Sequence, residues 1–219
     1  MNFPFDVILF DVGGVLLTDG WDHRERAAAV AEFHLDPGPF EAHHLAAVDA
    51  WERGLIGRDA YLDAAVFFEP RPFSREDFFA FMLSQSQLLP DGALGIAGEL
   101  AASNPCMLGT LNNEARETND YRFAHFGLRR YFRVALSSCY LGLRKPDPAI
   151  YRRALEIFGA PPERVLFIDD REENVAPAAA IGMRTIVFQG EDALRRALNS
   201  LDVLGSRQAH AACVEKAEG

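Results

Sequence analysis

Four consecutive apolar residues, Val7 to Phe10, constrain the fold of this chain more than any other stretch. An uninterrupted apolar run predicts a strand that is buried on both faces, as in the centre of a parallel sheet. Asp11 follows directly, with glycines at positions 13 and 14. Ligands of open α/β sheets bind beyond the carboxyl ends of the strands, so we expect Asp11 to project into that crevice, where glycine lets the backbone turn. The alternative is an aspartate that only begins a turn.

The chain carries two different patterns. Between residues 17 and 86 the apolar spacing is helical, and we expect four short helices, over 24–34, 40–51, 58–68 and 78–88. After residue 90, strands expected at 106–110, 134–138, 165–168 and 185–188 alternate with helices expected at 91–102, 114–126, 147–158, 172–181 and 192–199. This alternation predicts right-handed crossovers and a parallel sheet.

Local signals place several helix ends. Ser74 and Asp77 have the spacing of a capping box before the fourth helix. Asp147 and Pro148 fit the start of a later helix, with a capping side chain and a proline in the first turn. We expect the segment 36–39, which reads Asp-Pro-Gly-Pro, to end the first helix.

These patterns together predict an α/β fold, a Rossmann-like parallel sheet flanked by helices, with an inserted four-helix cap domain. We expect the catalytic core to comprise residues 1–16 and 87–205, and the helical cap to comprise 17–86. Residues 206–219 are polar and Ala-rich, and we expect them to be loosely held.

Composition limits the partners and the cellular compartment that we expect for this protein. The formal net charge is −10 and no run of Lys and Arg interrupts the acidic balance, which argues against a nucleic-acid surface. Cys106, Cys139 and Cys213 are odd in number and widely spaced, which suits a reducing cytosol. No export signal and no membrane-spanning stretch is visible. We expect a cytoplasmic protein, a monomer or homodimer, with no nucleic-acid or membrane partner.

Polar side chains follow four successive predicted strands. Asp11 follows the first, Thr110 ends the second with Asn112 and Asn113 after it, Lys145 lies in the loop after the third, and Asp169 and Asp170 end the fourth with Asn174 a turn later. Parallel strands end at one edge of the sheet, so these groups are expected to converge. Each also has a plain structural reading: Thr110 as strand filler, Lys145 as a solvated lysine, and Asp170 with Glu173 as a capping box.

The chemistry of this set points to a phosphoryl group. Asp11 and Asp170 offer the hard oxygen ligands that Mg²⁺ prefers, and Mg²⁺ often takes substrate phosphate as a further ligand. Thr110 and Lys145 can donate to phosphoryl oxygens. Clustered carboxylates repel a phosphate dianion, so such a site needs a cation. A carboxylate facing a phosphoryl group can act as nucleophile and form an acyl phosphate that water later cleaves.

This arrangement resembles the haloacid dehalogenase-like superfamily with a helical cap. The resemblance rests on Asp11, Thr110, the Lys145 of Arg-Lys-Pro, the Asp169-Asp170 pair with Asn174, and the helical insert. It implies that Asp11 is the nucleophile and a Mg²⁺ ligand, together with the Gly13 carbonyl, Asp170 and Asp169. It also implies that the phosphoryl group is bound by a set of residues along the strand ends, namely Thr110, Leu111, Asn112, Lys145 and Gly14.

Gly13 departs from the family pattern. Phosphatases of the family usually carry a second Asp at this position, as general acid to the leaving group and base for water. Losing a positioned acid or base typically costs about 10²–10⁴ in rate. The chain resembles the Asp-x-Gly-(Gly/Asn)-Val branch, which includes sugar-phosphate phosphatases. Our hypothesis is that the substrate has a good leaving group, or that a cap residue or a substrate group does the proton work.

The cap is expected to select the substrate. Arg53 and Arg58 flank the turn between the second and third helices, which faces the active site in similar proteins, so either could meet a second anionic or hydroxylated group. The alternative is a solvated charged turn. His43 and His44 are adjacent on one helix and therefore point in different directions, which does not favour a metal site.

Three functions remain open. The leading interpretation is a Mg²⁺-dependent phosphatase that acts on a small phosphorylated metabolite, such as a sugar phosphate, through an aspartyl-phosphate on Asp11. A halide-releasing hydrolase would use the same nucleophile without a metal, and the Asp169-Asp170 pair argues against it. A regulatory protein that binds a phosphorylated metabolite without turning it over is the non-enzyme alternative, and Gly13 is the feature in its favour.

Overall fold

A five-stranded parallel sheet organises the computed structural model, which describes residues 3–204. The strand order is β3-β2-β1-β4-β5. The strands are β1 (Val7–Phe10), β2 (Met107–Asn112), β3 (Val134–Ser137), β4 (Val165–Asp169) and β5 (Arg184–Val187). The predicted apolar run is the central strand, and its Phe10 pairs with Thr110 on one side and Ile168 on the other. The predicted α/β fold is confirmed.

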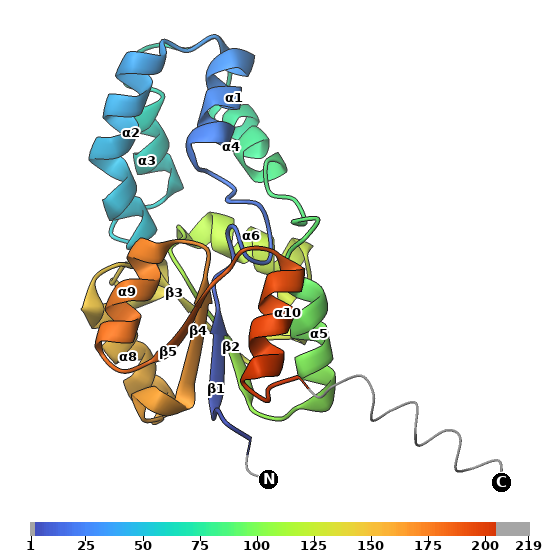
Figure 1. Ribbon diagram of the computed structural model, residues 1–219. Helices are drawn as coiled ribbons and strands as arrows, with labels where there is room; N and C mark the ends of the chain where they lie inside the picture. Colours follow the sequence, from blue (N-terminus) through green and yellow to red (C-terminus); the bar gives the residue numbers. More distant parts are fainter. Residues whose placement is uncertain (1–2, 205–219) are drawn as a thin grey trace, which may run out of the picture.

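Helices cover both faces of the sheet (Figure 1). α5 (Leu94–Ser103) and α10 (Glu191–Ser200) lie on one face, and α8 (Pro148–Phe158) and α9 (Glu172–Ala180) lie on the other. Side chains along β1 alternate between the two faces of the sheet and so belong to two apolar clusters. Ile8 and Phe10 pack towards α5, while Val7 and Leu9 pack towards α8. α6 (Arg116–His125) follows β2, and short helices are α7 (Ser138–Leu141), η1 (Leu128–Arg130) and η2 (Pro162–Arg164).

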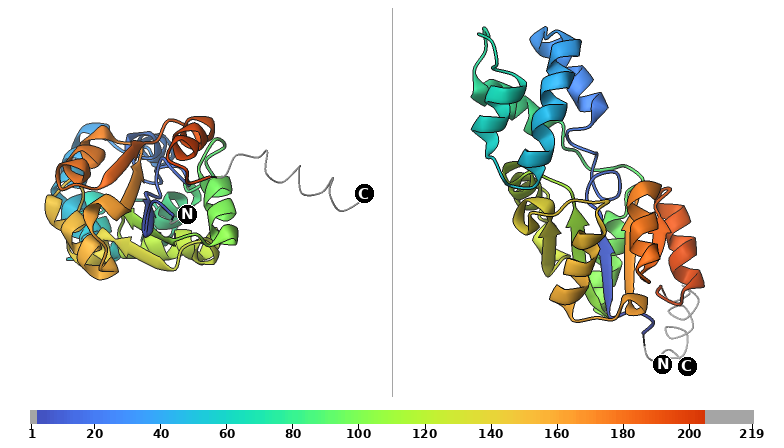
Figure 2. Two further views of the ribbon diagram at one scale, coloured as in Figure 1. Left: turned by 60° about the horizontal axis from the view of Figure 1, so that its bottom comes forward. Right: turned by 90° about the vertical axis from the view of Figure 1, so that its left-hand side faces the viewer.

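Four helices form a cap between β1 and β2: α1 (His23–Phe33), α2 (Pro37–Glu52), α3 (Arg58–Ala65) and α4 (Arg75–Ser84). They have a separate apolar core that includes Phe40, Trp51, Tyr61 and Phe78. The cap stands over the edge of the sheet where the strands end (Figures 1 and 2). The two chain segments that reach it lie side by side, since Leu17 bridges Leu88. The boundaries of the cap, residues 17–86, stay a prediction.

Several local predictions are confirmed and others are wrong. The Ser74–Asp77 capping box and the Asp147 cap are present. The first helix, α1, ends before the segment 36–39 as expected, but the second helix starts earlier than the predicted residue 40. Asp36 caps α2, which begins at Pro37, because proline tolerates the first helical turn, where no N–H partner is needed. The Asp170–Glu173 capping box is absent, since α9 is preceded by Arg171 without a side-chain cap.

Among the described residues, Cys106 and Cys139 are free thiols. The predicted loose tail, 206–219, lies outside the described residues, as does Cys213. Within residues 3–204, no helix combines the length and the apolar character that crossing a membrane requires.

Candidate active site

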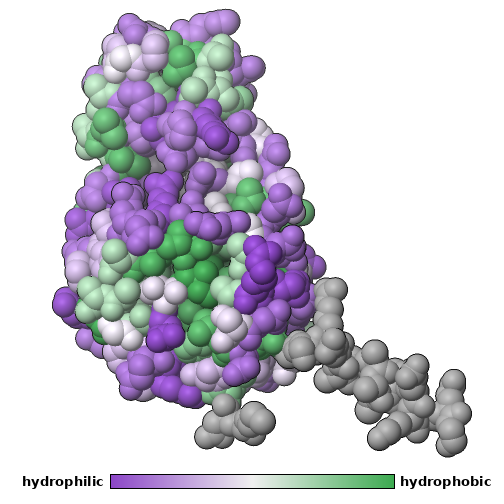
Figure 3. All heavy atoms as spheres, in the orientation of Figure 1, coloured by the Kyte–Doolittle hydropathy of each residue, from purple (hydrophilic) through white to green (hydrophobic). Residues whose placement is uncertain are grey.

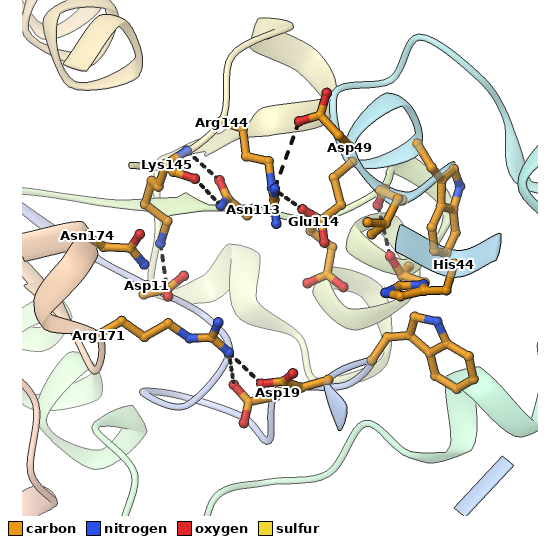
Figure 4. A pocket seen from close by; sticks show the side chains of 18 of the residues that line it. Asp11, Asp19, His44, Asp49, Asn113, Glu114, Arg144, Lys145, Arg171 and Asn174 are labelled. Carbon is orange, nitrogen blue, oxygen red and sulfur yellow. Dashed lines mark hydrogen bonds and ion pairs between the residues drawn. The ribbon is translucent and has the colours of Figure 1, made fainter. Parts of the chain in front are cut away.

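Three buried charged side chains meet at the carboxyl ends of the central strands. The Lys145 Nζ lies 2.9 Å from Asp11 Oδ2 (Figure 4). The same nitrogen lies 2.6 Å from Asp169 Oδ2. β1 and β4 are neighbours, so the residues that end them are brought together by the sheet itself. The prediction that Asp11, Lys145 and Asp169 lie at one edge therefore agrees with their placement.

Neighbouring amides hold this triad in place. The side chain of Asn113, just after β2, donates to the Lys145 carbonyl and accepts from the Lys145 N–H, both at 2.8 Å. Asp169 Oδ1 accepts from the Arg171 N–H at 2.9 Å and from the Asn174 Nδ2 at 3.0 Å. Asp11 Oδ1 accepts from the Val12 N–H at 2.7 Å. The charged groups are thus oriented before any ligand arrives, as efficient electrostatic stabilisation requires.

Burial and mutual charge set the protonation of the triad. Burial raises the pKa of Asp11 to about 8, since Lys145 offsets only part of the desolvation and Asp169 adds a negative charge. Burial acts to raise the pKa of Asp169 as well, but Lys145 and the hydrogen bonds to Asp169 hold it below its usual value. Burial acts to lower the pKa of Lys145, yet the two carboxylates raise it, so this side chain is an ammonium.

A third carboxylate completes a set that suits a divalent cation. Oxygens of Asp11, Asp169 and Asp170 all lie within 4.8 Å of one another. Asp170 Oδ1 is buried and has no hydrogen-bond partner among the described residues, and burial raises the pKa of Asp170. With all four groups ionised, three carboxylates exceed the single Lys145 charge by two. Hard oxygen donors with a twofold negative excess fit Mg²⁺.

Gly14 makes room for this set. Its φ is +68°, and a Cβ added there would lie 2.4 Å from Asp170 Oδ2. A larger residue would be strained by its backbone and would displace the carboxylate. Gly14 therefore lets Asp170 approach the end of β1.

The structure does not bring Thr110 to the cavity. In a parallel ladder, paired residues share a face, so Thr110 faces the same way as Phe10, into the apolar cluster beside α5. Its hydroxyl is buried and has no partner in the described part of the chain. Leu111 is buried on the opposite face, and the Asn112 Nδ2 donates to Asn119 Oδ1 at 3.1 Å.

The cap closes a cavity of about 490 Å³ over the triad. Asp11, Gly13, Lys145 and Asn174 line its floor, and Trp21, His44 and Trp51 belong to the cap residues that line it. Hydrophilic side chains gather on the visible face of the molecule where the cap meets the core (Figure 3). Both domains thus contribute to one enclosed space.

On the cap side of this cavity, neutral polar side chains contact one another in a row that was not predicted from the sequence. The Tyr61 hydroxyl accepts from Trp21 Nε1 and lies within hydrogen-bond distance of His44 Nδ1, at 2.8 Å. Burial lowers the pKa of His44 to about 4, which keeps the ring neutral. The available signal was its position on the apolar face of α2, in step with Phe40 and Trp51.

Ion pairs join cap and core on two sides of the cavity. Arg144 Nε lies 2.5 Å from Glu52 Oε2, and Arg171 Nη2 lies 2.6 Å from Asp22 Oδ2. Arg53, a predicted substrate contact, donates to the Gly142 carbonyl at 3.0 Å, beside the cavity. Arg58 pairs with Asp59 at 2.7 Å and does not line the cavity.

The fold and the acidic edge define an α/β protein with a parallel sheet, a helical insert after the first strand and a carboxylate cluster at the strand ends. Residues 5–182 match the family model of the haloacid dehalogenase-like hydrolases. This chain belongs to that family, as the sequence resemblance indicated.

Relatives share parts of the chain. It is 39% identical over 64 residues to drimenol cyclase drtB of Aspergillus calidoustus (29% of this chain, 12% of the relative). It is 38% identical over 76 residues to flavin mononucleotide hydrolase 1 of Arabidopsis thaliana (35% of this chain, 31% of the relative). The matches thus span less than a third of these relatives' length. A HAD family enzyme of Bacteroides thetaiotaomicron shares the fold, with a TM-score of 0.74 at 22% identity over 85% of this chain and 94% of that one.

Proposed function

We propose that this protein is a Mg²⁺-dependent phosphatase that hydrolyses a small phosphorylated metabolite, with Asp11 as the nucleophile. The observation that carries the proposal is the contact of Lys145 with both Asp11 and Asp169, beside Asp170, whose Oδ1 has no hydrogen-bond partner among the described residues. Asp11 and Lys145 line the cavity between the cap and the core. Two comparisons support it. The B. thetaiotaomicron enzyme has been solved with magnesium and inorganic phosphate, and a 32% identical segment belongs to glyceraldehyde 3-phosphate phosphatase of Pyrococcus furiosus.

Four groups would hold the cation: the carboxylates of Asp11, Asp170 and Asp169, direct or through water, and the carbonyl of Gly13. When bound, Mg²⁺ supplies the positive charge that lets a phosphate dianion approach three carboxylates. Lys145 adds one fixed charge at the same place and favours the ionised form of Asp11, against the effect of burial. We retain backbone groups of Gly14, Leu111 and Asn112 as proposed contacts of the phosphoryl oxygens, whereas the burial of Thr110 does not favour its side chain in this role.

Hydrolysis proceeds in two displacements. An Asp11 oxygen attacks phosphorus as the bond between phosphorus and the leaving-group oxygen breaks, which gives an aspartyl-phosphate. A water oxygen then attacks the same phosphorus, the bond to Asp11 breaks, and inorganic phosphate leaves. Lys145 remains beside the reacting oxygens throughout and stabilises the negative charge that develops on them.

The cavity favours a compact substrate with a hydroxylated, uncharged leaving group. Its volume of about 490 Å³ lies within the range of small-molecule sites. The neutral His44 ring offers a hydrogen bond, and the indole faces of Trp21 and Trp51 offer apolar contact, because their N–H groups already donate to Tyr61 and Glu117. A sugar phosphate has this chemistry, and we propose it as the substrate class.

A panel assay tests the proposed function. Sugar phosphates, small phosphomonoesters and 2-haloacids are assayed with and without Mg²⁺, with Asp11→Asn as the blank. Release of inorganic phosphate that requires both Mg²⁺ and Asp11 is the expected result. Halide release without metal would show a dehalogenase instead. Binding of a phosphorylated compound with no release would show the regulatory protein that Gly13 brings into consideration.

A further inference from the structure

The space beside Gly13, where a second acid usually stands in this family, is occupied by another carboxylate. A Cβ built on Gly13 finds Asp19 as its nearest neighbour, 3.4 Å from the Asp19 Cα and 3.6 Å from its Oδ1. Asp19 lines the same cavity as Asp11 and Lys145. Asp19 therefore brings a carboxylate to the space beside position 13, in the same cavity as the nucleophile.

We propose that Asp19 is the general acid and base of the reaction, in place of the side chain that position 13 lacks. This inference rests on the proposed function. In the first displacement an Asp11 oxygen bonds to phosphorus while the leaving-group oxygen separates from phosphorus. The Asp19 carboxyl gives its proton to that leaving-group oxygen. In the second, the Asp19 carboxylate takes a proton from the attacking water. The enzyme ends as it began, and the products are an alcohol and inorganic phosphate.

The backbone at Asp19 is fixed to the core. The guanidinium of Arg122, which is buried, donates to the carbonyls of Thr18 and Asp19. Arg122 is itself held by Glu114 at 2.7 Å. Gly20 follows with a φ of +86°, and a Cβ there would lie 3.1 Å from the guanidinium. This buried pair fixes the start of the cap segment, and the precision that general acid–base catalysis needs comes from such support.

The carboxylate itself stays available. Arg171 Nη2 lies 3.6 Å from Asp19 Oδ1, whereas the same nitrogen is 2.6 Å from Asp22 (Figure 4). The Asp19 side chain is 37% exposed, in contrast to the buried Asp11 and Asp169. Among the described residues it thus has one longer ion-pair contact, which leaves its oxygens free to meet a leaving group.

Glu52 is the competing carboxyl. It also lines the cavity, and burial raises its pKa, although Arg144 acts against this. It is engaged by Arg144 Nε at 2.5 Å, on a different side of the cavity from Arg171. Position 13, beside the nucleophile, has Asp19 and not Glu52 as its neighbour.

The leaving group provides the test. General acid catalysis matters most for a poor leaving group, so we expect Asp19→Asn to lower kcat/KM for ethyl phosphate by about 10²–10⁴ and that for 4-nitrophenyl phosphate by less than about tenfold. The ratio of the two substrates does not depend on the folded fraction of the variant. Asp49→Asn is the matched control, since Asp49 lines the same cavity on the Arg144 side. It should leave the ratio unchanged.

A second variant tests whether Asp19 takes the place of an acid at position 13. We expect Gly13→Asp to bring no gain in the wild-type background, but to restore ethyl phosphate turnover in the Asp19→Asn background, because a Cβ on residue 13 has no neighbouring atom closer than 3.4 Å. The inference is wrong if Asp19→Asn lowers both substrates equally, or if Glu52→Gln alone changes the ratio. Failure of the wild-type protein to release phosphate from either ester under Mg²⁺ is a separate result, and it would overturn the proposed function together with this inference.

Discussion

The floor of the cavity differs from its cap side in whether the buried polar groups are charged or neutral. On the floor, Lys145 lies between Asp11 and Asp169, and all three are buried charges. On the cap side, His44 and Tyr61 are buried but neutral. The floor therefore suits a reacting group of high charge, and the cap suits a group recognised by hydrogen bonds and shape. The difference indicates that the phosphoryl group and the rest of the substrate are bound by different parts of the cavity.

The largest effect is expected from removing the one cation of the floor. Lys145→Met leaves two buried carboxylates without their partner, which should lower the free energy of unfolding by about 3–5 kcal/mol. Urea denaturation measures this, and the Mg²⁺-dependent phosphatase activity should be lost in the same variant. Arg153→Met is the control, because Arg153 forms an exposed pair with Glu156 and its loss should cost less than about 0.5 kcal/mol. Equal losses in the two variants would contradict the comparison.

On the cap side, the expected effect appears as a dependence of stability on pH. The pKa of His44 falls from 6.5 to about 4 on folding, so below pH 6.5 the unfolded chain binds a proton that the folded chain refuses. The stability due to this residue is present above pH 6.5 and is lost as the pH falls towards 4, by about 3 kcal/mol in all. Urea midpoints between pH 7 and 4 measure the slope. His44→Gln should flatten it, while His43→Gln, at an exposed neighbour, should not.

Metal addition tests the floor without touching the cap. Mg²⁺ at a hundred times its dissociation constant should raise the free energy of unfolding by about 2.7 kcal/mol. Thermal unfolding with Mg²⁺ and with EDTA measures the difference. Asp170→Asn removes the carboxylate that has no protein partner and should reduce the shift. Asp192→Asn, on the exposed side of α10, should retain it in full.

The smallest effect is expected at Arg58. Although the sequence suggested a place near the substrate, this side chain pairs with Asp59 outside the cavity. Arg58→Ala should change kcat/KM for a sugar phosphate by less than about twofold and the stability by less than about 0.5 kcal/mol. A tenfold rise in KM would show that the cap contacts substrate where the structure does not place it.

The floor could be predicted because it follows from topology. Strands of a parallel sheet end at one edge, so Asp11 and Asp169 meet whatever the intervening sequence does. Thr110 shows where prediction from the topology alone fails. β2 runs to Asn112, two residues beyond the predicted end, so Thr110 is an interior strand residue and alternation turns its side chain into the core.

The residues that sequence reasoning missed depend on contacts between distant segments. Asp19 lies beside Gly13 because Arg122 and Glu114, about a hundred positions later, hold the intervening turn. No local periodicity records such a contact. His44 was visible as a polar residue on an apolar helix face, but only the structure shows that its Nδ1 contacts the Tyr61 hydroxyl, seventeen positions later.

The ion pairs on the two sides of the cavity also determine how the site exchanges with solvent. Arg144 is bound to Glu52 and Arg171 to Asp22, so the cap cannot lift without separating charges of opposite sign. Dissolved salt screens such pairs over a Debye length of about 8 Å at physiological ionic strength. Opening of the cavity is thereby tied to the ionic strength of the medium. Where product release limits turnover, the catalytic rate should rise with added neutral salt, although no reacting group is altered.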